Sequence, residues 1–223
     1  RNVQLAEDPQ LIPKGKGMLF VPAMSVPIGN EPSYQVFKDD GKELLSASPG
    51  NGVILPPGRY DVLIGSGTIT QKVAKTIVVL DGHTTLMKPD WAALAIDVID
   101  QSRTSINESY EIYHEGTQEN FGVGFGIEEE RGERVRTWIL APGVYNIVKV
   151  GQPFSTTRKF SIHLQPGELS QRNLVFDSNS DEYVGFYPRP TLRSGNTAAA
   201  KNIISRTELS GSTLINTTQR NPA

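Results

Sequence analysis

The sequence contains no cysteine, which excludes disulfide bonds, thiolate metal sites and cysteine nucleophiles together. It has no run of about 18 apolar residues, so a transmembrane helix is not expected. Up to residue 190, no stretch repeats its apolar side chains with the 3.6-residue period of an amphipathic helix. Without helical patterns, the fold is expected to consist of strands and turns.

An excess of charge of one sign is also lacking. Lys and Arg number 22 against 24 Asp and Glu, for a net charge of −2. Polyanion binding needs a basic patch or stripe, and the cations here are scattered among acids. Nucleic acid and anionic membrane surfaces are therefore not expected as partners.

Glycine and proline, by contrast, are spread along most of the chain and separate short runs rich in Val, Ile, Thr, Tyr and Phe. The run Tyr60–Ile64 follows Pro56-Pro57-Gly58, and Thr76–Leu80 precedes the turn dipeptide Asp81-Gly82. This pattern predicts an all-β fold. The 223 residues suit two domains of ordinary size.

An internal repeat supports two domains. Ile54–Val62 reappears as Ile139–Ile147, and Ile77–Gly82 reappears as Ile162–Gly167. Upstream, the sequence of the two copies matches at a shorter spacing. There Ser33–Phe37 aligns with Ser109–Tyr113, and Met18–Val21 falls on Leu94–Asp97 at the same spacing. Four segments in the same order indicate a duplication.

The spacing is 85 residues for Ile54 and Ile139 but 76 for Tyr34 and Tyr110, so the second copy contains an insertion. It must lie between Tyr113 and Ile139, and the charged stretch from Glu128 to Arg134 is the candidate. Insertions concentrate at exposed loop tips. We therefore expect an extended, charged hairpin there.

Both copies contain Pro-Gly-X-Tyr, at Pro57–Tyr60 and Pro142–Tyr145. Pro and Gly supply a turn, and the tyrosine two residues after the glycine falls on the inward face of the next strand. We expect Tyr60 and Tyr145 to be core or corner residues rather than ligand contacts.

With a first strand at Gly17–Val21 and the later strand and turn at Ile77–Thr85, these motifs resemble PEGA-like and carboxypeptidase-regulatory-like (transthyretin-like) modules. The resemblance covers roughly residues 15–180 as two copies. It implies small β-sandwiches common in bacterial envelope proteins, which act as spacers, adhesion surfaces or docking domains and carry no catalytic set.

The predicted fold is thus two tandem Ig-like/transthyretin-like β-sandwich modules with an extended C-terminal tail. The expected divisions are an N-terminal segment at 1–14, modules at 15–90 and 91–182, and a linker and tail at 183–223. In the tail, residues 209–217 alternate like the opening strand of an outer-membrane β-barrel. A loose or edge-pairing terminus is the alternative.

Sites for chemistry are not evident. His83, His114 and His163 lack the local spacing of a metal site. Asp177–Glu182 offers oxygen ligands but lacks the glycine and distal glutamate of a calcium loop, so a solvated turn is expected. Gly122–Gly126 is not followed by a helix, as a phosphate cradle would require. We predict no enzyme, no cofactor and no metal.

The leading hypothesis is a non-catalytic structural and docking module with protein partners in the cell envelope, periplasmic or associated with the outer membrane, where it would form the N-terminal periplasmic part of a longer protein. A carbohydrate-binding module is the alternative, because aromatic side chains on one sheet face can stack on sugar rings. The candidate interaction residues are Glu128, Glu129, Glu130, Arg131, Arg134, Trp91, Trp138, Phe186 and Tyr187. For the two tryptophans, packing at the module junction and in the second core is the competing interpretation.

Overall fold

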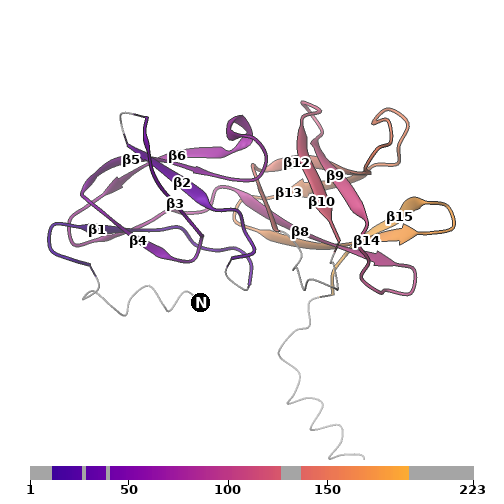
Figure 1. Ribbon diagram of the computed structural model, residues 1–223, viewed down its shortest axis with the longest axis horizontal. Coiled ribbons are helices and arrows are strands. Elements are labelled where there is room, and N and C mark those ends of the chain that lie inside the picture. Colours follow the sequence, from indigo (N-terminus) through magenta and orange to yellow (C-terminus); the bar gives the residue numbers. More distant parts are fainter. Residues whose placement is uncertain (1–11, 27–28, 39–40, 127–136, 191–223) are drawn as a thin grey trace, which may run out of the picture. The chain divides into compact units, whose positions relative to one another are not determined.

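A computed structural model describes residues 12–26, 29–38, 41–126 and 137–190 (Figure 1). The expected charged hairpin, with Glu128, Glu129, Glu130, Arg131 and Arg134, lies outside the described residues, and so does the predicted barrel strand at 209–217. Within the described segments every element is a strand except one short 3-10 turn, Ile69–Gln71. The predicted all-β fold is confirmed.

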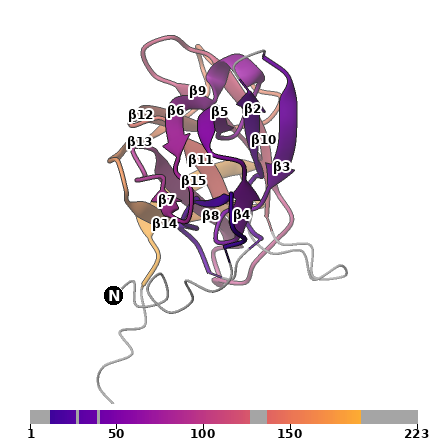
Figure 2. The ribbon, with the colours of Figure 1, turned by 90° about the vertical axis from the view of Figure 1, so that its left-hand side faces the viewer.

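The first module is a sandwich of two sheets. Its three-stranded sheet has the order β4-β1-β7 and its four-stranded sheet the order β3-β2-β5-β6. Figure 2 shows β2, β5 and β6 in one layer and β4 and β7 in the other. The strands are β1 (Gly17–Phe20), β2 (Tyr34–Lys38), β3 (Glu43–Ala47), β4 (Gly52–Leu55), β5 (Gly58–Ile64), β6 (Val73–Val79) and β7 (Thr84–Leu86).

The second module repeats this arrangement with longer strands. Its sheets have the orders β11-β8-β14-β15 and β10-β9-β12-β13. Reading along the chain, β8 corresponds to β1, β11 to β4 and β14 to β7, while β15 is an addition. The strands are β8 (Ala92–Asp100), β9 (Ser109–His114), β10 (Asn120–Phe125), β11 (Thr137–Leu140), β12 (Gly143–Lys149), β13 (Phe160–Leu164), β14 (Leu169–Asp177) and β15 (Glu182–Pro188).

The two copies agree down to single hydrogen bonds. The Gly82 N–H donates to the Lys16 carbonyl at 2.8 Å, and the Gly167 N–H donates to the Trp91 carbonyl at 2.7 Å. Likewise Leu19 pairs with Val53 in the first module, as Leu94 pairs with Trp138 in the second. The copies therefore match strand for strand.

This pairing corrects the alignment of the first strand by one residue. The sequence comparison placed Met18 on Leu94, whereas the register makes Leu19 the counterpart of Leu94. Both leucines are fully buried. Side chains alternate across a strand, so a one-residue shift exchanges the two faces. The comparison could not detect the shift, because most positions of β8 are apolar and buried.

The recurring tyrosines are core residues that also tie the corner of the chain, as expected. The Tyr60 hydroxyl donates to the Pro56 carbonyl at 2.8 Å, and the Tyr145 hydroxyl donates to the Ala141 carbonyl at 2.9 Å. Each bond spans four residues and closes the Pro-Gly turn onto the following strand. Buried tyrosine hydroxyls usually have such a partner.

Tyr60→Phe should therefore lower the free energy of unfolding by about 1 kcal/mol, since it removes a part-buried hydrogen bond and keeps the ring. Tyr34→Phe is the matched control in the same core. Tyr34 is fully buried, and its hydroxyl has no hydrogen-bond partner in the described structure. Urea unfolding of the two variants should separate them; equal losses would refute the role given to the Tyr60 hydroxyl.

Two hydrophobic cores are present, and the first crosses the module boundary. Leu19, Val62 and Ile64 of the first module lie in one cluster with Trp91 and Ile139 of the second module. Ala93 also belongs to this cluster. The second core is built around the inner faces of β8, β9 and β12. The core of the first module thus includes three residues of the second module, Trp91, Ala93 and Ile139.

The β11-β8-β14-β15 sheet of the second module continues through Pro188, past the expected module end at residue 182. β15 pairs antiparallel with β14 along its length, and Tyr183 is buried in the second core. Just beyond the strand, Arg189 Nη2 lies 3.4 Å from the Asp97 carboxylate, and the Arg189 N–H donates to the Gln171 carbonyl. Residues 183–188, expected from the sequence to lie in the linker and tail, belong to an added edge strand.

Candidate functional site at the module junction

The edge strand β11 is closed by loops of the first module. The Ser66 N–H donates to the Ile139 carbonyl at 2.7 Å, and the Ile139 N–H donates to Ser66 Oγ at 3.0 Å. The Thr137 N–H donates to the Asn30 carbonyl at 3.2 Å. An edge strand has main-chain groups without sheet partners. Here residues of the first module form hydrogen bonds with the edge of β11, so the two modules share a specific interface.

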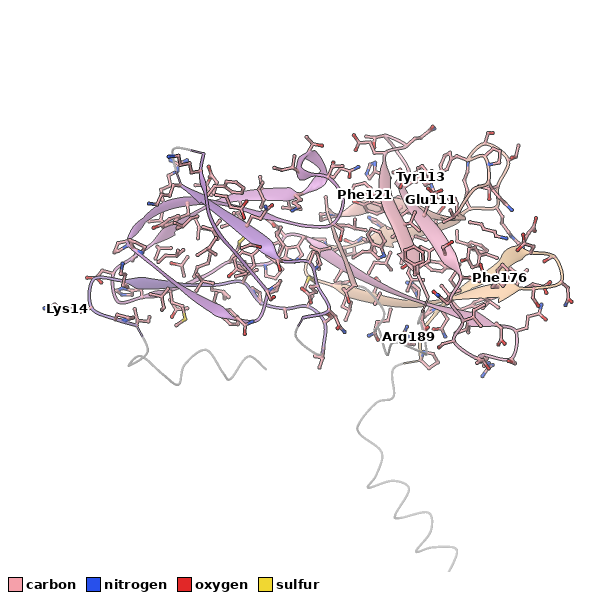
Figure 3. All side chains as sticks on the ribbon, viewed as in Figure 1. Lys14, Glu111, Tyr113, Phe121, Phe176 and Arg189 are labelled. Carbon is pink, nitrogen blue, oxygen red and sulfur yellow. The ribbon has the colours of Figure 1, made fainter. Side chains whose placement is uncertain are left out.

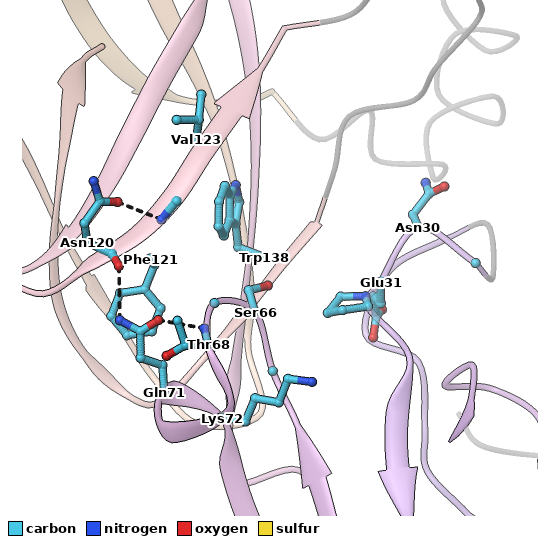
Figure 4. A pocket seen from close by; sticks show the side chains of 15 residues that line it. Asn30, Glu31, Ser66, Thr68, Gln71, Lys72, Asn120, Phe121, Val123 and Trp138 are labelled. Carbon is cyan, nitrogen blue, oxygen red and sulfur yellow. Dashed lines mark hydrogen bonds between the residues drawn. The ribbon is translucent and has the colours of Figure 1, made fainter. Parts of the chain in front are cut away.

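A cavity of about 760 Å³ opens beside these contacts (Figure 4). Its walls come from the loop before β2, the loop and 3-10 turn between β5 and β6, and strands β10 and β11. Its lining combines glycine main chain, amide and hydroxyl groups, one carboxylate, one ammonium group and two aromatic rings. The lining residues are Gly29, Asn30, Glu31, Pro32, Gly65, Ser66, Gly67, Thr68, Gln71, Lys72, Asn120, Phe121, Gly122, Val123 and Trp138.

A chain of side-chain hydrogen bonds forms one wall of the cavity. Gln71 Nε2 donates to the Asn120 carbonyl at 3.1 Å, and Gln71 Oε1 accepts from the Thr68 N–H at 2.8 Å. Asn120 Oδ1 in turn accepts from the Gly122 N–H at 2.7 Å (Figure 4). These bonds join the 3-10 turn of the first module to β10 of the second. The amide groups of Gln71 and Asn120 therefore both form hydrogen bonds that stabilise this wall.

The wall continues to the outer face of β9. Asn120 Nδ2 donates to Glu111 Oε1 at 2.9 Å and to the Tyr113 hydroxyl at 3.0 Å. Glu111 and Tyr113 lie close together on β9 (Figure 3). Phe154 covers Tyr113 with ring centroids 4.7 Å apart, and the Lys159 ammonium lies 4.0 Å from the Phe154 ring centroid. The polar network thus ends in a small aromatic and cationic cluster on the second module.

Close packing explains the Gly-Ser-Gly sequence at the junction. Gly67 has φ +85°, and a Cβ placed there would lie 2.3 Å from Gln71 Oε1 and 3.2 Å from the Phe121 ring. At Gly65 a Cβ would lie 3.4 Å from the Ile139 carbonyl oxygen. At Gly67 a side chain would therefore crowd both Gln71 and the Phe121 ring of the second module, whereas at Gly65 the glycine is favoured by its φ of +145°.

Gly67→Ala should consequently lower the free energy of unfolding by about 2 kcal/mol or more, through backbone strain and displacement of Gln71. Gly82→Ala provides the control, since Gly82 has φ +68° but open space around its Cα. It should cost only the backbone part, about 1 kcal/mol. Chemical denaturation measures both values, and equal losses would contradict the close packing at Gly67.

Glu31 is a buried carboxylate beside the cavity, with 7% of its surface exposed. Its Oε1 accepts from the Met24 N–H at 2.6 Å and from Ser25 Oγ at 2.8 Å. The side chain therefore fastens the loop that supplies Asn30. Its role in the junction is to shape the loop.

The shifted group nearest the cavity is Tyr113 in the network behind the wall, where partial burial and the Glu111 carboxylate raise the pKa of its hydroxyl. Burial raises the pKa of Tyr34 and of Tyr145 to about 12, and burial also raises the pKa of Tyr183. Hydrogen bonds from Ser102 and Thr104 lower the pKa of Asp100 in an exposed turn. None of these groups lines the cavity. Acid–base catalysis places such groups in a cleft.

Buried tyrosines should make the fold labile to alkali. Their pKa values are about 12 in the folded protein against 10.0 for the free side chain, so the unfolded chain loses protons first. The stabilisation is complete below pH 10 and is lost as the pH rises towards about 12, by roughly 2–3 kcal/mol for each tyrosine. Urea unfolding between pH 8 and about 11.5 should show this decline. Tyr34→Phe should reduce it; an unchanged decline would contradict the assignment to Tyr34.

The four candidate interaction residues that the structure describes lie in different surroundings. Trp91 is fully buried in the first core, and Trp138 is 3% exposed, with its Nε1 donating to the Tyr110 hydroxyl at 3.0 Å. Phe186 packs against the second core beside Phe160, whereas Tyr187 is 58% exposed. Trp91 occupies a packing position in the first core, whereas Trp138, although nearly buried, belongs to the lining of the cavity.

The sequence interpretation missed the residues that form the junction, among them Asn30, Ser66, Gln71 and Asn120. One signal was available. Gly65-Ser66-Gly67 aligns with Val150-Gly151-Gln152 at the spacing of the flanking strands, so the repeat breaks there. A segment on which two copies differ marks where one of them has acquired a contact of its own.

The described residues contain no group of three or more His, Asp or Glu side chains placed to hold a metal ion. In the segments that the structure describes, no helix is long and apolar enough to cross a membrane.

No protein-family model matches the chain, and no curated protein sequence matches it. Solved structures with a similar arrangement include the TIE protein of Bacillus anthracis, at 18% identity and a TM-score of 0.30, covering 72% of this chain and 34% of that one. A fimbrial assembly protein of Parabacteroides distasonis has 10% identity and a TM-score of 0.30, with 80% and 100% covered.

The minor pilin of Streptococcus agalactiae has 9% identity and a TM-score of 0.28, with 79% and 99% covered. The chain thus spans about a third of the TIE protein, and it spans 26% of a leucine-rich repeat protein from Bacteroides thetaiotaomicron. With TM-scores this low, the sandwich fold rests on the strand order and register described above.

Proposed function

We propose that the chain is a non-catalytic structural unit of the bacterial cell envelope, in which two PEGA-like or transthyretin-like sandwiches serve as a spacer and a docking surface for other proteins. Module boundaries near residues 90 and 188 are part of this proposal. Its periplasmic or outer-membrane location follows from the family resemblance of the repeat.

The observation that carries the proposal is the junction. A spacer must hold its modules in one arrangement, whereas modules joined only by a linker move by default. Here Ile139 is fully buried in the core of the first module, and the Ser66 main chain is bonded to it. The loop Gly65-Ser66-Gly67 serves this contact in one copy only, as expected if selection acted on the junction.

The absence of cysteine allows a direct test. Spin labels attached at Asp81→Cys and Ser155→Cys, both exposed positions in different modules, report the distance between the modules by pulsed electron paramagnetic resonance. A fixed junction predicts a narrow distribution that persists in the full chain. A broad distribution, as for a flexible linker, would overturn the spacer role.

Cellular location needs a separate experiment. An antibody raised against the chain should detect the protein in the envelope fraction of the source bacterium. Recovery in the cytosolic fraction alone would contradict the envelope assignment and leave the fold untouched.

A further inference from the structure

Strand β4 is an edge of the first module whose outward main-chain groups have no partner in the described structure. The Met18 N–H donates to the His83 carbonyl, and the Met87 N–H donates to the Phe20 carbonyl, so the main chain of both β1 residues is directed towards β7. Met18 pairs with Ile54 and Phe20 with Gly52. In an antiparallel pair this leaves the N–H and C=O groups of Ile54 and Gly52 on the side away from β1.

In the second module, three of the four equivalent groups have a hydrogen-bond partner: the Ile139 N–H, the Ile139 carbonyl and the Thr137 N–H. Ile139 and Thr137 stand 85 residues after Ile54 and Gly52, at corresponding places on β11. Their outward groups bond to Ser66 and Asn30 of the first module. The fold therefore uses this edge as an interface once, on β11. It presents the equivalent edge a second time, on β4, where no described residue bonds to it.

The outer sheet faces beside these two edges differ in the same way: the face beside β11 is covered, and the face beside β4 is exposed. In the second module Ala93 and Ile139 are fully buried by the first module. Their counterparts Met18 and Ile54 lie on an outward face, where Ile54 is 37% exposed and Leu86, paired beside Phe20, is 45% exposed. Grouped apolar side chains on a sheet face beside an open edge are typical of an interaction site.

We propose that β4 pairs with β4 of a second copy of the chain, antiparallel and about a two-fold axis at Val53. Such pairing sets Gly52 opposite Ile54 of the other copy, and both residues direct their main-chain groups outward. Each Ile54 side chain then lies over a position without a Cβ, where the Met18 thioether supplies an apolar surface. A two-fold contact requires a self-complementary patch, and the Gly52-Val53-Ile54 spacing provides one.

A head-to-tail contact with the second module of another copy fits less well. In that module Lys149 takes the place of Ile64, and Gly151 takes the place of Ser66. Lys149 also forms an ion pair with Asp181. The end of the second module thus lacks the counterparts of the Ile64 side chain, which packs in one cluster with Ile139 of β11, and of the Ser66 hydroxyl, which accepts the Ile139 N–H. The self-association does not depend on the spacer role, which holds for a monomer or a dimer.

Sedimentation equilibrium of the full chain tests the proposal. We expect a monomer–dimer equilibrium that moves to dimer as the concentration rises through the micromolar range. Ile54→Asp should abolish the dimer, because two carboxylates would face the contact, and Leu86→Asp should weaken it. Val78→Asp is the matched control, since Val78 is 55% exposed on β6 of the other sheet. It should leave the equilibrium unchanged.

Hydrogen exchange gives a second readout that a misfolded variant cannot imitate. The amides of Gly52 and Ile54 should become protected as the concentration of the wild-type chain increases. A chain that stays monomeric throughout, or a dimer that Ile54→Asp leaves intact while the variant keeps its fold, would overturn the proposal. Protection that is independent of concentration and disappears when residues 1–11 are deleted would also overturn it, in favour of coverage by the chain's own N-terminal segment.

Discussion

Replacing Ile139 by alanine should lower the free energy of unfolding by about 3 kcal/mol, although the residue belongs to the outer face of its own sheet. Ile139 is fully buried, and it lies in the core of the first module. Truncation leaves a cavity between the modules that the surrounding strands fill only in part. The variant should also lose stability in the first module, which hydrogen exchange of β5 amides would detect.

Ile54→Ala is the internal control for this prediction. Ile54 occupies the corresponding position of the first copy and is 37% exposed, so its truncation should cost less than about 1 kcal/mol. Urea unfolding compares the two variants under the same conditions. Equal losses would show that Ile139 is no more buried than its counterpart, and the described junction would then be wrong.

Trp91→Ala should have a comparable or larger effect, a loss of about 3–5 kcal/mol. The indole is fully buried in the first core, while the Trp91 carbonyl accepts the Gly167 N–H of the second module at 2.7 Å. The side chain therefore fills one module while its main chain is bonded within the other. Removing the ring leaves that hydrogen bond in place and empties the largest fully buried position.

Tyr187→Ala is the control for Trp91→Ala, because it removes an aromatic ring that is exposed instead of packed in a core. Tyr187 is 58% exposed, and its truncation should change stability by about 0.5 kcal/mol or less. Thermal or chemical unfolding provides the measurement. A small loss for Trp91→Ala would return Trp91 to the set of candidate ligand-stacking residues.

Much of the fold follows from local sequence because turns and alternation are local properties. The Pro-Gly-X-Tyr turns and the strand that each begins could be predicted from residues close together in the chain, and the duplication from the recurrence of such short motifs. The alignment of β1 with β8 was wrong by one residue, since β8 is apolar on both faces and its outer face is buried by the other module. That burial is a long-range property that the sequence of β8 alone does not determine.

The junction could not be predicted for the same reason. Ser66 and Ile139 are far apart in sequence, and a serine between two glycines is typical of any turn. β15 was missed because a run ending in Pro188 also suits a linker. An edge strand tolerates such a proline, since one side of it has no sheet partner.

The central claim is that the two modules form one cooperative unit through this junction, and the two tryptophans allow it to be measured directly. Trp138→Phe leaves Trp91 as the reporter of the first core, and Trp91→Phe leaves Trp138 as the reporter of the second. In each variant, urea unfolding followed by tryptophan fluorescence should coincide with the transition followed by circular dichroism of the whole chain. A fluorescence transition clearly separated from the dichroism transition would show independent modules, and would contradict the claim.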